Sequence, residues 1–427
     1  MELNDLEVQG LKEENYFSKH KFGFGILAGI LCVLFACFAF VQVLNMTGQV
    51  IVIGGNNVVT PVDNSPLLDE ATIEKVNEIY AKMNYLYYED FSADQIREKM
   101  YAGMLAGLAD PYSAYYTDEE YAENQISLTG KYYGIGAGLQ QDAKTMEVTI
   151  TKIYAGTPSE EAGLKEGDIV LYVGDIDATS MELSNLVQNI RGEEGTKVHM
   201  VVYRPATEET LEFDVERRNV VLPSVEGEML DDGIGYIQVT DFQDETDEQF
   251  IKMVNAYMKD GMKGMIVDIR SNPGGYLDTV NNMLDYILPE GLIVYTEGAY
   301  GNRREFKSDA SCIDIPIVVL VNENSASASE IFAGAIKDHD YGTIVGKTTF
   351  GKGLVQKYYG LQTGGVIKLT VEKYYTPSGN YIHGVGIVPH VEVDYEYTGA
   401  EDKPYDKQYD SQFLQALDIM QKELTQQ

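Results

Sequence analysis

The chain has 427 residues, of which 44% are hydrophobic and 23% charged, a composition typical of a folded protein of two or three domains. Its formal net charge is −35, and its basic residues form no phosphate-binding face, so nucleic acid is not an expected partner. The three cysteines (Cys32, Cys37 and Cys312) provide neither a disulfide framework nor a zinc-ligand spacing. Cys312 stands alone in a polar loop and is expected to be inert. We expect no metal and no cofactor.

An uncharged apolar run extends from Phe22 to Val41. As a helix rising about 1.5 Å per residue it would span roughly 30 Å, the thickness of the bilayer hydrocarbon. Lysines precede the run, and no Lys or Arg follows it until Lys75, so the positive-inside rule places residues 1–21 in the cytoplasm. We therefore predict a single-pass anchor in the cell membrane over residues 22–44, with the rest of the chain outside. A long cleaved signal peptide is the alternative.

The segment that follows changes from turns to helices. Glycines and prolines make residues 45–66 a turn-rich linker. Residues 67–117 form a helical segment, because apolar residues recur there at helical spacing. We predict two or three helices, which end before Asp110-Pro111.

Residues 118–218 form a compact β-rich unit. Short alternating or apolar runs at 148–153, 168–173 and 198–203 predict strands, separated by turn clusters. Residues 181–190 have the pattern of a helix. This unit is therefore expected to be a separate small domain.

Residues 219–396 have a β/α pattern, and residues 397–427 form a C-terminal segment. Near-continuous apolar runs at 264–269 and 315–321 are typical of strands buried on both faces of a mostly parallel sheet. Amphipathic helices are expected at 244–259 and 329–337. The fold class is therefore an α/β core that carries a β-rich domain.

A serine-rich turn joins the second of these strands to a helix. Ser325-Ala-Ser327-Ala-Ser329-Glu330 contains small residues that allow a tight turn and close approach of a ligand. Backbone N–H groups at a helix start can stabilise the oxyanion formed when a serine attacks a carbonyl. Simple helix capping by serine is the alternative explanation for this segment.

Lys352 follows 25 residues after Ser327, between two glycines. A lysine can act as a general base if burial lowers its pKa by roughly 3 units. Gln356 is placed to hold the amine by a hydrogen bond. A phosphate-binding loop is the alternative for Gly346–Gly353, but Gly353 stands where such a loop needs Ser or Thr, and a strand rather than a helix is expected to follow.

A Pro-Gly-Gly turn ends the strand at 264–269. Gly274 and Gly275 could direct an N–H group at a ligand, beside that of Ala328, and so form an oxyanion hole; an ordinary turn is the alternative. A Ser-His-Asp triad is disfavoured because no G-x-S-x-G motif occurs and no spacing recommends His339, His383 or His390.

Together these motifs resemble the carboxyl-terminal processing peptidases, the S41 family of serine endopeptidases with a Ser-Lys dyad. The resemblance covers roughly residues 67–395 and includes the motifs DIRSNPGG, SASASE and FGKG in the family's order. It implies a ClpP/crotonase-like core in which Ser327 is the nucleophile, Lys352 the base and Gln356 the residue that positions the lysine. His390 departs from the family, which usually has Asp there.

The resemblance further implies that residues 118–218 are a PDZ domain that binds the C-terminus of a protein or peptide substrate. Tyr133-Gly134-Ile135-Gly136 matches the loop that presents N–H groups to a peptide carboxylate. A catalytically inactive PDZ adaptor is the competing hypothesis. The sequence leaves open whether the chain forms homo-oligomers.

Overall fold

The computed structural model describes residues 67–400 and 403–426. The chain divides into two compact units, one ending at Ser92 and also containing Tyr300–Asn302, the other containing the remaining residues. The predicted anchor and linker lie outside the described residues. Within the described ranges, no helix is both long and apolar enough to cross a membrane.

The described part of the first unit contains one long helix, α2 (Glu70–Leu86). The Asp69 carboxylate caps it by accepting a hydrogen bond from the Thr72 N–H at 2.8 Å. No residue of α2 is buried.

The second unit begins with α3 (Ala93–Ala106), strand β1 (Ala114–Tyr116) and α4 (Asp118–Thr129). Helices α2 and α3 thus lie where helices were expected, while the end of the predicted 67–117 segment contains strand β1.

A six-stranded sheet forms the centre of the second unit. Its strands, in spatial order, are β10 (Val225–Met229), β11 (Ile234–Val239), β12 (Gly264–Asp268), β15 (Ile317–Val321), β16 (Thr343–Gly346) and β19 (Val391–Glu392). All neighbours are parallel except β10 and β11. The apolar runs at 264–269 and 315–321 became its fully buried strands β12 and β15, as their sequence predicts.

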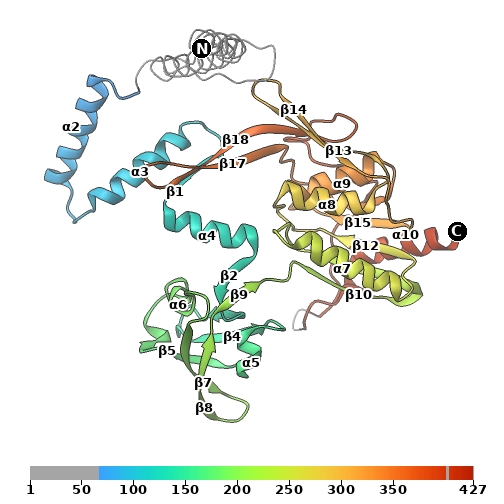
Figure 1. Ribbon diagram of the computed structural model, residues 1–427, viewed down its shortest axis with the longest axis horizontal. Coiled ribbons are helices and arrows are strands. Elements are labelled where there is room, and N and C mark those ends of the chain that lie inside the picture. The colour runs from blue at the N-terminus through green and yellow to red at the C-terminus, as the bar shows by residue number, and fades with distance from the viewer. Residues whose placement is uncertain (1–66, 401–402, 427) are drawn as a thin grey trace, which may run out of the picture. The chain divides into compact units, whose positions relative to one another are not determined.

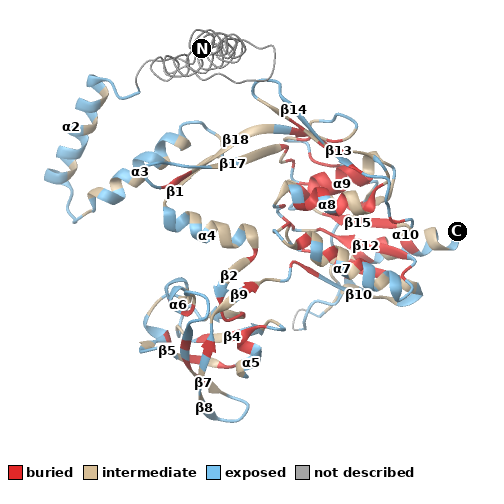
Figure 2. Ribbon diagram, in the orientation of Figure 1, coloured by how far each residue is buried: buried red, intermediate tan, exposed pale blue. Residues whose placement is uncertain are grey.

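Helices cover both faces of this sheet (Figure 1). They are α7 (Thr246–Lys259), α8 (Leu277–Ile287) and α9 (Ala328–Asp338) on one face and α10 (Ser411–Gln426) on the other. Alternation along β12 separates the two cores, because Met265 and Val267 pack with the first three helices and Ile266 packs with α10. Figure 2 shows the resulting concentration of buried residues in β12, β15, α8 and α9.

A five-stranded antiparallel sheet was not predicted. It consists of β1, β18 (Val366–Tyr375), β13 (Gly291–Gly298) and β14 (Arg303–Ser308) in that order, with β17 (Leu354–Gly360) also paired to β18. The prediction of a mostly parallel sheet is therefore right for the central sheet, while the other sheets are antiparallel. Strands were expected after Gly353 and near residue 366, where β17 and β18 lie, but their local patterns did not predict that they pair with each other and with β13 and β1.

The β-rich unit has its own antiparallel sheet and its own core. The strands are β3 (Ala137–Gln141), β4 (Val148–Ile153), β5 (Ile169–Val173), β6 (Ile176–Asp177), β7 (Lys197–Arg204) and β8 (Glu209–Glu216), accompanied by helices α5 (Pro158–Ala162) and α6 (Leu183–Ile190). A two-stranded ribbon, β2 (Lys131–Gly134) and β9 (Arg218–Val221), brackets the unit in sequence. Helix α4 falls inside the predicted 118–218 segment but precedes this ribbon.

A buried ion network fixes the end of β12. Arg270 donates to Asp268 at 2.6 Å and to Asp410 at 2.7 Å, and its side chain is 11% exposed. Tyr236 donates a further bond to Asp268 at 2.8 Å. The network therefore joins the chain just before the Pro-Gly-Gly turn to the segment that begins α10.

Replacing Arg270 by methionine is expected to destabilise the protein by about 3–5 kcal/mol, because two buried carboxylates lose their counter-charge. Urea unfolding of both proteins measures the difference. Lys422→Met is the control, since that lysine forms an exposed i,i+4 pair with Asp418, worth about 0.5 kcal/mol. Equal losses in the two variants would contradict a special role for the buried network.

Candidate active site

Ser327 lies at a strained turn between β15 and α9. It is the N-cap of α9, with φ 56° and ψ −112°, and its main-chain N–H donates to Glu330 Oε2 at 2.9 Å. A positive φ is unfavourable for a residue with a Cβ, and such strain is concentrated at functional sites. Strand-turn-helix geometry of this kind presents a serine hydroxyl at the carboxyl end of a sheet. Ser327 is accordingly part-exposed between buried neighbours.

The neighbouring serines hold this turn against the Pro-Gly-Gly turn. Ser325 and Ser329 are fully buried. The Ser325 hydroxyl donates to the Ile269 carbonyl at 2.8 Å, and the Ser329 hydroxyl donates to the Asn272 carbonyl at 2.9 Å. Both hydroxyls are thus used in structure, which leaves Ser327 as the serine of this segment that faces the cleft described below.

Glu330 joins the Ser327 turn to the Lys352 loop. Its fully buried carboxylate accepts hydrogen bonds from the main-chain N–H groups of Ser327 at 2.9 Å, Gly351 at 2.7 Å and Lys352 at 2.8 Å. The Thr349 hydroxyl donates a fourth bond at 2.6 Å. The sequence did not single out Glu330, because a glutamate in the first turn of a helix is ordinarily a simple cap.

These bonds also exclude the phosphate-loop alternative. The N–H groups of Gly351 and Lys352 donate to the protein's own carboxylate, where a phosphate-binding loop would direct them at a ligand. The loop leads into strand β17, not into a helix. Nucleotide binding at Gly346–Gly353 is therefore not supported.

Lys352 is held in an environment that favours the neutral amine. Burial is the main cause that lowers the pKa of Lys352, and the positive charge of Lys368 lowers it further, against opposing effects of Glu330 and Asp110. Nζ lies 4.9 Å from the centre of the Tyr112 ring. A lowered pKa makes Lys352 a better proton acceptor at a given pH than an exposed lysine, which is the direction that the sequence hypothesis requires.

One cleft brings the predicted catalytic residues together. A cavity of about 450 Å³ is lined by Ser327, Lys352, Gln356, Gly274, Gly275 and Ala328, along with residues of α4 and β17. The hydrogen bond of the Gln356 side chain in the described structure runs from Nε2 to the Thr370 hydroxyl at 3.2 Å, not to Lys352. None of the three histidines considered as bases lines this cleft. Cys312 is exposed and lies outside it.

The two glycines of the predicted oxyanion hole differ in whether their main-chain N–H groups are free to bind a ligand. The N–H of Gly274 donates to Asn272 Oδ1 at 2.8 Å. The N–H groups of Gly275 and Ala328 form no hydrogen bond within the part of the chain that the structure describes. Gly275 and Ala328 are therefore the pair that can stabilise an oxyanion, and Gly274 is a structural member of the turn.

Substituting alanine for Gly275 is expected to lower kcat about a hundredfold. Gly275 has φ 145°, and a Cβ there would lie 2.1 Å from the Phe242 carbonyl oxygen, so the turn must move. Gly103→Ala on α3 is the control, since a Cβ there meets no atom within 4 Å. Peptide hydrolysis by both variants provides the measurement. Full activity of Gly275→Ala would exclude this N–H from the site.

The β-rich unit has a groove between β3 and α6. The cavity of about 220 Å³ is lined by Ala137, Gly138 and Leu139 of β3, Val187 and Ile190 of α6, and also Tyr132, Ile135, Tyr154 and Arg191. Strand β3 is at the edge of its sheet, so a peptide can pair with it.

The predicted carboxylate loop is only partly at this groove. Ile135 lines it, but Tyr133 is 50% exposed and Gly134 and Gly136 are outside the lining. Tyr132 and Arg191, which stack at 5.3 Å, line the groove and were missed by the sequence analysis. Their proximity depends on the fold of residues far apart in the chain.

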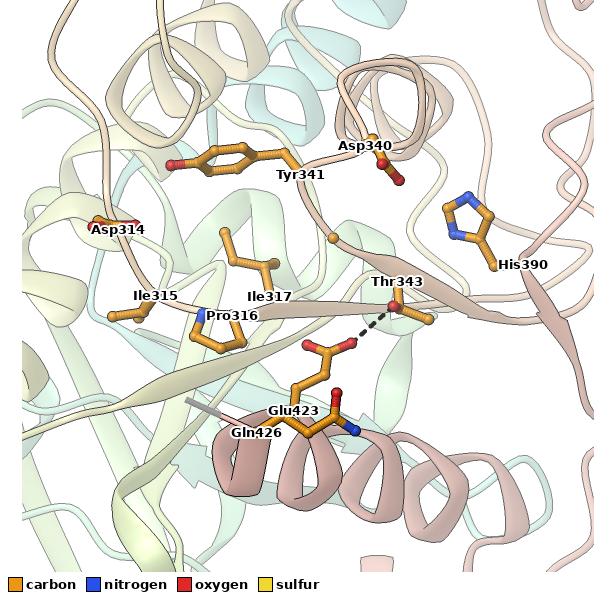
Figure 3. Close-up of a pocket in the computed structure, with 11 residues that line it drawn as sticks. Asp314, Ile315, Pro316, Ile317, Asp340, Tyr341, Thr343, His390, Glu423 and Gln426 are labelled. Atoms are coloured by element: carbon orange, nitrogen blue, oxygen red, sulfur yellow. Dashed lines mark hydrogen bonds between the residues drawn. The ribbon is translucent and has the colours of Figure 1, made fainter.

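A third cavity lies at the end of the central sheet opposite to Ser327 (Figure 3). It measures about 510 Å³ and is lined by residues at the start of β15 and β16, including Ile317 and Thr343, and by α10, from which Glu423 accepts a bond from Thr343 at 3.0 Å. Ligands of open α/β sheets bind at the carboxyl ends of strands, where Ser327 is.

His390 also lines this third cavity. Its Nδ1 accepts a hydrogen bond from the Ile344 N–H at 3.0 Å, and burial lowers its pKa. His390 thus has a structural hydrogen bond at the position where the family resemblance leads us to expect Asp.

Comparisons with known proteins agree with this architecture. Residues 233–393 match the profile of peptidase family S41, and residues 149–204 match that of the PDZ domain. A probable CtpA-like serine protease of Staphylococcus aureus is 34% identical over 330 residues, which are 76% of this chain and 66% of that protein. The chain belongs to peptidase family S41.

Other proteins match this S41 family member over a similar part of the chain. A probable CtpA-like serine protease of Staphylococcus epidermidis is 33% identical over 327 residues, with the same coverage of 76% and 66%. Among solved structures, the photosystem II D1 C-terminal processing protease has 28% identity and a TM-score of 0.44, covering 74% of this chain and 86% of that one. The matched region thus spans 66% of the two staphylococcal proteins.

Proposed function

We propose that this S41 family member is a membrane-anchored serine endopeptidase that uses a Ser-Lys mechanism. Ser327 attacks the peptide carbonyl while Lys352 takes up the proton of its hydroxyl. The oxyanion receives hydrogen bonds from the N–H groups of Gly275 and Ala328. Lys352 then gives its proton to the leaving amine, and a water molecule, deprotonated by Lys352, hydrolyses the acyl-enzyme to a new C-terminal carboxylate.

One observation carries this proposal. Ser327 and Lys352 line the same cleft as the two unpaired N–H groups, and the fully buried Glu330 braces both of their main-chain segments. The lowered pKa of Lys352 supports its role as base. A serine, a neutral amine and an oxyanion hole in one cleft are the components of acyl transfer.

The other parts of the proposal have separate support. The groove between β3 and α6 is the basis for proposing that the PDZ domain binds the C-terminus of a protein or peptide substrate. The apolar run from Phe22 to Val41 is the basis for the anchor over residues 22–44 and for an extracytoplasmic active site. Gln356 is proposed to position Lys352, because both side chains line the same cleft.

The test is to incubate the full-length chain, purified in detergent, with unfolded protein substrates and to identify new C-termini by mass spectrometry. The wild type and the control Ser311→Ala, an exposed serine outside the cleft, are expected to cleave the same bonds. Ser327→Ala is expected to cleave none. Binding of C-terminal peptides by the wild type without any cleavage would favour the PDZ adaptor.

A further inference from the structure

One wall of the catalytic cleft is an edge strand. Within the described residues β17 pairs with β18 alone, so its outer edge keeps unpaired N–H and C=O groups. Leu354 to Tyr358 of β17 line the cleft. An extended peptide can therefore add to this edge as a strand and pass the nucleophile in a defined register.

Three cations besides Lys352 line the cleft, and one of them has no counter-charge. Lys357 pairs with Glu372 at 2.7 Å, and Arg304 faces Asp278 at 3.6 Å. Lys368 forms no ion pair with any carboxylate in the described part of the chain. Its Nζ lies 5.5 Å from the centroid of the Tyr116 ring.

The position of Lys368 distinguishes it from the other lysines that have no ion pair, because it lines the cleft that contains Ser327. Lys368 is only part-exposed, and a partly desolvated charge without a partner costs free energy. A ligand carboxylate would supply the missing partner.

The register of the sheet places Lys368 beside the path of the substrate. Thr370 lies opposite Gln356 and Lys368 lies opposite Tyr358, so these side chains share one face. The pair that contains Lys368 is thus two residues farther along β17 than the pair that contains Gln356, a distance of about 7 Å. A substrate strand on β17 would bring a side chain, or its own C-terminus, next to this amine.

We propose that Lys368 binds a carboxylate of the peptide substrate and so makes the cleft selective for negative charge a few residues from the scissile bond. The carboxylate belongs either to an acidic side chain or to the substrate's C-terminus. This inference rests on the proposed peptidase function. The charge of Lys368 also lowers the pKa of Lys352, so replacing Lys368 changes the base as well. The test therefore compares two substrates with the same enzyme, because a change in the base affects both substrates equally.

The experiment measures kcat/KM for matched peptides that the full-length wild type cleaves. One series carries Glu or Gln at each position from the second to the fifth on either side of the scissile bond, with an amidated C-terminus. A second series carries Gln at all of these positions. Its peptides end two to five residues after the scissile bond, with either a free or an amidated C-terminus. The wild type is expected to prefer the carboxylate about tenfold at one position of one series, which identifies the source.

Variants then assign that preference to Lys368. Lys368→Met is expected to abolish the carboxylate preference, Lys368→Arg to keep it, and Lys368→Glu to favour a lysine-containing peptide. Lys373→Met is the matched control, because Lys373 is on the same strand and also lies over a tyrosine ring, at 5.3 Å, but is outside the cleft lining.

The outcomes separate the two proposals. Cleavage with equal kcat/KM for carboxylate and amide at every position, or a preference that survives in Lys368→Met, overturns the Lys368 assignment alone. Failure of the wild type to cleave any peptide overturns the peptidase function and this inference together. A preference that weakens between low and high salt in the wild type, without any variant, supports the carboxylate site independently.

Discussion

Replacing Lys352 by methionine is expected to lower kcat/KM for peptide hydrolysis by about a thousandfold or more, because Ser327 loses the group that removes its proton. Methionine keeps the length of the side chain and fills the same partly buried space. Lys347→Met is the matched control. It lies five residues earlier, outside the cleft lining, where Lys347 pairs with Glu392 at 2.7 Å. Retention of more than a tenth of wild-type activity in Lys352→Met would exclude a base role.

The pH dependence of the two proteins should differ in a defined way. Only the neutral amine of Lys352 accepts a proton, so wild-type kcat/KM should rise with pH until it passes the pKa of this lysine, which burial sets below 10.5. Residual hydrolysis by Lys352→Met should lack this rise.

The free energy of unfolding should also depend on pH through the titration of Lys352. Between the lowered folded-state pKa of Lys352 and 10.5, the unfolded chain binds more protons, so wild-type stability gains a rising contribution with pH. Lys352→Met removes that contribution and should be no less stable than the wild type at neutral pH. Urea unfolding across this range measures it, and marked destabilisation of the variant at neutral pH would contradict the burial argument.

Replacing Glu330 by glutamine is expected to lower kcat about a hundredfold and stability by about 3 kcal/mol. The carboxylate accepts four hydrogen bonds, and a glutamine amide turns one acceptor oxygen into a donor that faces N–H or O–H groups. The main chain at Ser327 and at Lys352 then loses its common support. Both kcat and the free energy of unfolding must be measured, because these hydrogen bonds position the main chain at Ser327 and Lys352 and also stabilise the fold.

Glu323→Gln is the control for this variant. Glu323 is exposed in the same turn and should leave both measurements unchanged. If Glu330→Gln lost stability but kept wild-type kcat in the folded fraction, the carboxylate would be a purely structural group.

The sequence predicted the features that depend on local pattern. The buried strands before Ser327 and before the Pro-Gly-Gly turn were identifiable because uninterrupted apolar runs are typical of central parallel strands. The family motifs brought Ser327, Lys352 and Gln356 into one hypothesis, and the structure places all three on one cleft.

Other features depend on pairings that no local pattern encodes. Gly274 and Gly275 are indistinguishable in sequence, and only the fold shows that Asn272 occupies the first N–H. Gln356 was expected to bond Lys352, but the register of β17 on β18 sets it opposite Thr370. Glu330 acts on the Lys352 loop from a helix that precedes it by some twenty residues. Long-range partners of this kind appear only when the sheets are assembled.

The most direct test of the Ser-Lys account is reaction of the full-length protein with a fluorophosphonate, followed by peptide mapping of the modified residue. A single adduct is expected on the Ser327 hydroxyl, with a rate that increases as pH rises through the pKa of Lys352 and that falls about a thousandfold in Lys352→Met. Modification at any other residue, or equal labelling rates in the wild type and Lys352→Met, would contradict the account.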